Sequence, residues 1–68
     1  MYKLKSWFEY GVLSGFSESY FRKLTEVYEV KIVSLVIGNY GLINRMDFHV
    51  EGEKENMEKF VKVLNSLA

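Results

Sequence analysis

The order in which apolar residues change their spacing restricts the fold of this chain more than any other feature. They alternate with other residues over 2–13 and recur every three to four positions over 17–28. Alternation returns over 29–39 and 42–52, and helical spacing over 53–68. Alternation indicates a half-buried strand, and recurrence every three to four residues indicates an amphipathic helix. The chain therefore predicts strand, helix, strand, strand, helix.

These segments predict an α+β domain with the ferredoxin-like β-α-β-β-α plan, in which residues 1–68 form a single domain. Right-handed crossover between the first two strands places both helices on one face of the sheet. The segment "GNYG" at 38–41 predicts a hairpin turn, because Gly and Asn tolerate positive φ. The expected sheet is antiparallel and three-stranded with order 1-3-2, which leaves the first strand at an edge.

Helix signals are clear at both helical segments. Ser17 is expected to cap the first helix, and Glu18 favours the positive end of its dipole. Thr25 is expected on the polar side of this helix, opposite an apolar stripe of Tyr20, Phe21, Leu24, Val27 and Tyr28. The second helix carries its own stripe, made of Met57, Phe60, Val61, Leu64 and Leu67.

Alternation also assigns strand residues to the two faces of the expected sheet. Met46, Phe48 and Val50 fall under the helices. The opposite face, which no helix covers, is expected to carry the large apolar side chains of Trp7, Val33, Leu35 and Ile37. Such a patch exceeds what solitary soluble domains usually expose. These four residues are therefore the candidate binding surface, most simply for another copy of the chain.

The small size of the domain also favours self-association. A domain of 68 residues is marginally stable alone, and the chain has no cysteine for a disulfide or a Cys-based zinc site. With one histidine, no metal or cofactor is expected. An unpaired strand edge is a template for another strand. We therefore expect a homodimer formed through the edge of the first strand, with the open sheet face available to a protein partner.

Charge and hydropathy narrow the classes of partner and location. Nine basic residues balance nine acidic ones, whereas nucleic-acid binders normally carry a basic excess. Trp7, Tyr10 and Phe48 suggest a base-stacking sheet, but alternation places Phe48 under the helices. Binding of single-stranded nucleic acid is therefore kept as an alternative. No apolar stretch spans a bilayer and the N-terminus is not a secretory signal, so a cytoplasmic protein without membrane association is expected.

The segment "YGVLSGFSESYFRKL" at 10–24 is the strongest candidate in the sequence for a ligand-binding site. A glycine-rich turn before a helix can present amide groups to an anion, so Gly11, Gly15 and Ser17 are a possible anion site. Gly11, Val12 and Phe16 resemble the G-V-x-x-F-R turn of the acylphosphatase-like group of ferredoxin-like proteins. The segment "VEGEKENMEKF" at 50–60 is similar to the entry into that group's second helix. The resemblance implies phosphate binding and acyl-phosphate hydrolysis as an alternative function.

The chain departs from that group at the residues that carry its chemistry. Ser17 stands where the group has its arginine, and Arg22 lies further on, inside the helix. Asn39 is near the place of the group's water-positioning asparagine, and the fourth strand is absent. His49 between Asp47 and Glu51 belongs to the outward strand face, where charges stay solvated. We therefore expect a non-catalytic binding or regulatory module that works as a homo-oligomer.

Overall fold

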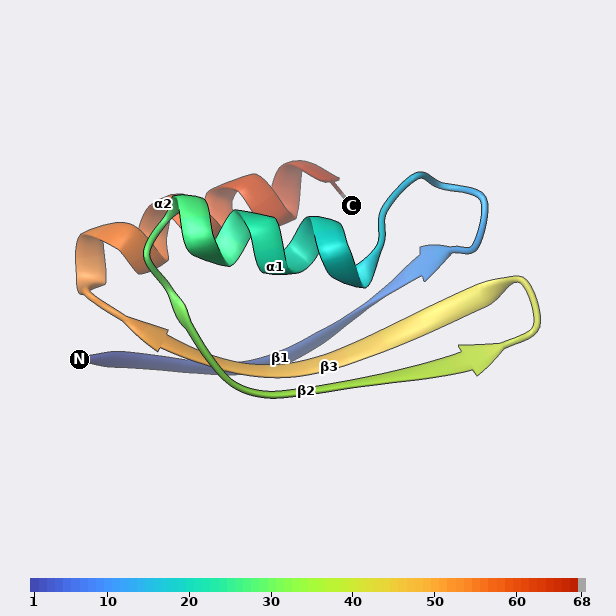
Figure 1. Ribbon diagram of the computed structural model, residues 1–68, viewed down its shortest axis with the longest axis horizontal. Helices are drawn as coiled ribbons and strands as arrows, with labels where there is room; N and C mark the ends of the chain where they lie inside the picture. Colours follow the sequence, from blue (N-terminus) through green and yellow to red (C-terminus); the bar gives the residue numbers. More distant parts are fainter. Residues whose placement is uncertain (68) are drawn as a thin grey trace.

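The computed structural model describes residues 1–67, with the side chains of 1–66. Its elements are β1 (Tyr2–Gly11), α1 (Glu18–Val27), β2 (Lys31–Tyr40), β3 (Ile43–Gly52) and α2 (Lys54–Leu67). The strands form an antiparallel sheet with order β1-β3-β2, and both helices lie on the same face of it (Figure 1). The predicted α+β class, element order and strand order are confirmed.

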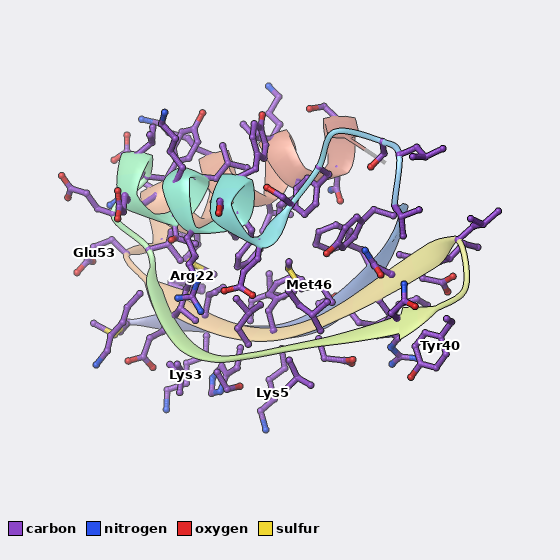
Figure 2. The ribbon with its side chains drawn as sticks, turned by 45° about the vertical axis from the view of Figure 1, so that its right-hand side comes forward. Lys3, Lys5, Arg22, Tyr40, Met46 and Glu53 are labelled. Carbon is purple, nitrogen blue, oxygen red and sulfur yellow. The ribbon has the colours of Figure 1, made fainter. Side chains whose placement is uncertain are left out.

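The core lies between the sheet and the two helices. Its fully buried side chains come from β3 and from both helices: Phe21, Met46, Val50 and Phe60. Figure 2 shows Met46 between the sheet and the helices. The ring of Phe21 lies 5.6 Å from that of Phe60 and 5.2 Å from that of Phe48, between centroids. The alternation predicted for β3 is thus confirmed.

Helix α1 begins as predicted but presents a different stripe to the core. Ser17 Oγ accepts a hydrogen bond from the Tyr20 amide at 3.2 Å, which is the expected cap. Thr25 is buried, and its hydroxyl donates to the Arg22 carbonyl oxygen at 2.6 Å, whereas Val27 is exposed. The expected sides of Thr25 and Val27 were wrong, because positions four apart from Phe21 share its face and positions six apart do not. The expected core position Leu67 lies outside the described side chains.

The β2–β3 turn lies later than the "GNYG" segment predicts. Tyr40 pairs with Ile43, so the turn consists of Gly41 and Leu42, with Gly41 at a φ of 74°. Asn39 lies in the strand opposite Asn44, and its side-chain amide donates to Asn44 Oδ1 at 2.8 Å and to the Gly41 carbonyl oxygen at 3.1 Å. Glycine at the first turn position is typical of a type II′ hairpin.

A β-bulge in β2 reverses the faces predicted for its second half. The pairing with β3 shifts between Ile32 and Ser34, so Val33 is the extra residue. Beyond it Leu35 lies opposite Phe48 and Ile37 opposite Met46, and both pack against the core. The prediction that Leu35 and Ile37 lie on the helix-free face was wrong, because one inserted residue moves every later side chain to the other face.

Candidate functional site

The open face, the side of the sheet away from the helices, carries a tryptophan on the edge strand β1. Trp7 is half exposed, and the Arg45 guanidinium carbon lies 4.3 Å from the centroid of its ring. Arg45 also forms a two-point ion pair with Asp47, at 3.2 Å from Nε to Oδ2 and 3.1 Å from Nη2 to Oδ1. The Asp47 hydrogen bond raises the pKa of Arg45 above its ordinary value. Arg45 is thus held in place over Trp7 by Asp47.

Further apolar side chains surround this group on the open face. Val36 lies opposite Asp47 on β2, as Trp7 does on β1, and it is 64% exposed. Tyr40 and Ile43 are exposed on the same face near the hairpin turn, and Figure 2 shows Tyr40 below the sheet with Lys3 and Lys5. We call Trp7, Val36, Tyr40 and Ile43 the open-face patch.

The open-face patch differs from the predicted binding surface. Of the four predicted residues, Trp7 lies on the open face and Val33 is half exposed at the bulge, whereas Leu35 and Ile37 are packed against the core. Val36 and Tyr40 were not predicted on this face. The bulge reverses the face of Val36, and the later turn extends β2 to Tyr40. Apolar residues stand at both even and odd positions between Ile32 and Ile37, so the sequence pattern alone does not fix which of them face the core.

The free edge of β1 is the second candidate feature. The Val12 amide donates to the Leu42 carbonyl oxygen at 3.0 Å, which places the backbone groups of Val12 on the β3 side. Backbone groups point to alternate sides along a strand. The N–H and C=O groups of Lys3, Lys5, Trp7 and Glu9 therefore point away from β3, along an edge that spans most of a ten-residue strand.

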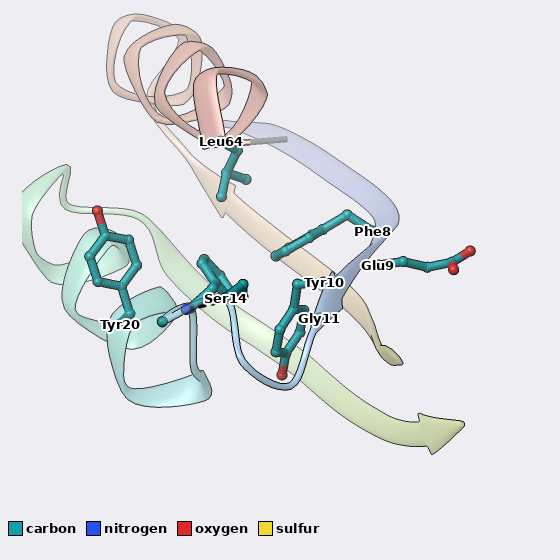
Figure 3. A pocket seen from close by; sticks show the side chains of 9 residues that line it. Phe8, Glu9, Tyr10, Gly11, Ser14, Tyr20 and Leu64 are labelled. Carbon is teal, nitrogen blue, oxygen red and sulfur yellow. Dashed lines mark hydrogen bonds between the residues drawn. The ribbon is translucent and has the colours of Figure 1, made fainter. Parts of the chain in front are cut away.

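Two hollows flank this edge on the helix side of β1. One, of about 450 Å³, lies between β1 and α2 and is lined by Leu4, Met57 and Val61 among others. The second, of about 440 Å³, is lined by four aromatic side chains and Leu64 (Figure 3). Its rings are those of Phe8, Tyr10, Phe16 and Tyr20, with Phe16 at 4.9–5.5 Å from the other three between centroids. Both hollows are mainly apolar.

The loop between β1 and α1 uses its polar groups internally. The Ser14 amide donates to the Gly11 carbonyl oxygen at 3.0 Å, and the Phe16 amide to Ser14 Oγ at 3.3 Å. Ser17 Oγ caps α1, and Gly15 adopts a φ of 83° that favours glycine. Gly11 and Gly15 line the aromatic hollow, but Ser17 is not part of its lining. The anion site at these three residues stays a prediction.

The charged residues considered for catalysis are not gathered into one site. Arg22 is paired with Glu18 at 2.9 Å on the surface of α1. Asp47 and His49 line a hollow of about 330 Å³ on the open face, but Asp47 is engaged by Arg45. Within residues 1–67, no cluster of three His, Asp or Glu side chains is placed to hold a metal ion.

Comparisons with known proteins give no match for this chain. The chain matches no protein-family model, and neither the curated proteins nor the solved structures give a significant match. The resemblance to the acylphosphatase-like group therefore stays a prediction. Neither α1 nor α2, as described, is long and apolar enough to cross a membrane.

Proposed function

We propose that this chain is a small, non-catalytic protein-binding or regulatory module that acts as a homo-oligomer. Its fold in this proposal is the ferredoxin-like plan without the last strand, so that β1 is left as an edge. The observation that carries the proposal is this edge: four residues of β1 direct their backbone N–H and C=O groups away from β3. An edge of this length is a template for an added strand, and a second copy supplies an equally open one.

The open-face patch supports the binding part of the proposal. Trp, Tyr and Arg are the residue types that most often dominate the energy of protein interfaces. Trp7, Tyr40 and Arg45 lie on this one face, and Arg45 is already held over Trp7 before any partner arrives. Pairing two β1 edges would bring the open faces of both copies into one continuous surface. A protein partner, or a second dimer, would then bind across it.

The hydrogen bonds and ion pairs of Ser17, Arg22 and Arg45 favour a binding function over catalysis or nucleic-acid recognition. Ser17 and Arg22, the residues nearest in sequence to an acylphosphatase-like phosphate site, serve as a helix cap and in an ion pair with Glu18. Arg45, the arginine of the open face, is matched by Asp47, so it offers less positive potential to a phosphate backbone. A cytoplasmic location remains a prediction.

The proposal is tested by removing one outward amide without disturbing the sheet. Lys5→Pro deletes an N–H that points away from β3, and proline is tolerated at such edge positions. We expect the wild type to sediment as a dimer at high concentration and Lys5→Pro as a folded monomer. Lys5→Gln is the matched control, because it loses the charge but keeps the amide, and it should still associate. A wild type that is monomeric throughout a concentration series would contradict the proposal.

A further inference from the structure

We propose that the dimer has one specific register, in which two β1 strands pair antiparallel about Ser6. This inference rests on the proposed function, since it requires the β1 edges to meet. The register places these residues of the two copies opposite one another: Tyr2 and Tyr10, Lys3 and Glu9, Leu4 and Phe8, Lys5 and Trp7, Ser6 and Ser6. In this register β1 is complementary to itself, because opposite charges face each other and apolar side chains face each other.

The backbone of β1 leaves few two-fold registers to choose from. Lys3, Lys5, Trp7 and Glu9 direct their hydrogen-bonding groups outward, as does Gly11, whose carbonyl oxygen already accepts from the Ser14 amide. In an antiparallel contact these outward residues pair with one another. A two-fold axis then passes through Lys5, Ser6 or Trp7 if most of the strand is to be paired. The three choices differ in which side chains meet across the axis.

Charge disfavours the axis at Lys5, and the β1–α1 loop disfavours the axis at Trp7. An axis at Lys5 sets two Lys5 side chains directly opposite each other, which is destabilising. An axis at Trp7 pairs Lys5 with Glu9 but sets Lys3 opposite Gly11. The Gly11 carbonyl oxygen already accepts a hydrogen bond from the Ser14 amide at 3.0 Å.

The axis at Ser6 satisfies both faces of β1. On the open face, Lys3 meets Glu9 of the other copy twice. Within their own chain Lys3 lies opposite Glu51 and Glu9 opposite Arg45, and neither forms an ion pair there among the described side chains. On the helix side, Leu4 meets Phe8 twice, which brings apolar surface against the rims of the two hollows. Ser6 is small and exposed, so the two strands can approach closely at the axis.

Single cysteines distinguish the three registers, because the chain has no cysteine of its own. In the proposed register the Ser6 positions form a non-hydrogen-bonded pair with Cα atoms about 4.5 Å apart, within the range of a disulfide. Lys5 and Trp7 each lie about 7–8 Å from their own copies along the diagonal. We therefore expect Ser6→Cys to form a disulfide-linked dimer under mild oxidation much faster than Lys5→Cys or Trp7→Cys.

The outcomes separate the register from the proposed function. The mass of each cysteine variant is measured under reducing conditions before oxidation. Reduced variants that dimerise while Lys5→Cys or Trp7→Cys cross-links fastest would overturn the Ser6 register and leave the proposed function standing. If neither the reduced variants nor the wild type dimerises, both proposals fail.

A charge exchange gives an independent test. Glu9→Lys should weaken dimerisation about tenfold, because it replaces attraction by repulsion at two symmetry-related pairs. Adding Lys3→Glu should restore most of the affinity, since opposite charges then face each other again. Lys23→Glu, on the exposed surface of α1, is the control for a charge change away from the edge. Rescue of Glu9→Lys by Lys5→Glu instead of Lys3→Glu would overturn the proposed register in favour of the axis at Trp7.

Discussion

Leu35 and Val36 are consecutive residues of β2 whose side chains lie on opposite faces of the sheet, Leu35 against the core and Val36 64% exposed on the open face. The bulge at Val33 sets this arrangement, since alternation from Ile32 without a bulge assigns each residue to the other face. Leu35 therefore stabilises the fold, whereas Val36 is accessible to a partner.

The two residues give a matched pair of variants. Leu35→Asp should lower the free energy of unfolding by at least about 2 kcal/mol, because it removes packing against the core and sets a carboxylate without a partner in a partly buried, apolar position. Val36→Asp should lower it by about 1 kcal/mol or less, because the side chain stays exposed and the loss comes from the lower strand preference of Asp and from the facing Asp47 carboxylate. Urea unfolding followed by circular dichroism measures both. Equal losses from the two variants would show that the bulge does not divide the faces as described.

The second prediction concerns Phe60 in the core. Phe60 is fully buried and its ring lies 5.6 Å from that of Phe21, between centroids, so Phe60→Ala should cost about 3–5 kcal/mol. A stability of about 0.05–0.15 kcal/mol per residue gives about 3–10 kcal/mol for 68 residues, so this loss should remove a large share of it and lower the melting temperature steeply. Val27→Ala, at a 64% exposed position of α1, is the control and should remain folded. Thermal unfolding distinguishes the two.

The third prediction concerns Ser17. Because its hydroxyl caps α1 through the Tyr20 amide, Ser17→Ala should destabilise the fold by about 0.5–2 kcal/mol, whereas Ser19→Ala inside the helix should have little effect. Millimolar phosphate should not raise the melting temperature of the wild type above that in chloride of equal ionic strength.

A phosphate-dependent rise that follows RT ln(1 + [L]/Kd) would instead reveal an anion site at the Gly11–Ser17 loop. The rise should then grow in Ser17→Arg, which introduces an arginine at the place where the acylphosphatase-like turn has one. That result would contradict the interpretation of this loop as a structural turn and cap.

Much of this architecture could be predicted from local patterns. The cap at Ser17 and the alternation of Met46, Phe48 and Val50 depend on residue type and spacing alone, and both are found in the structure. The bulge at Val33 and the continuation of β2 to Tyr40 depend on pairing with β3, which single-strand patterns do not contain. The open-face patch was therefore only partly predictable: Trp7 precedes these irregularities along the chain, whereas Val36 and Tyr40 follow the bulge.

Amide hydrogen exchange along β1, measured by NMR at several protein concentrations, reports directly on whether a second strand pairs with this edge. The amides of Lys3, Lys5, Trp7 and Glu9 point away from β3, so they are protected only when a second strand pairs with them. We expect these four amides to exchange slowly at high concentration and faster on dilution, while those of Leu4, Ser6 and Phe8 stay protected throughout. Fast exchange of the four outward amides at every concentration would contradict pairing at this edge.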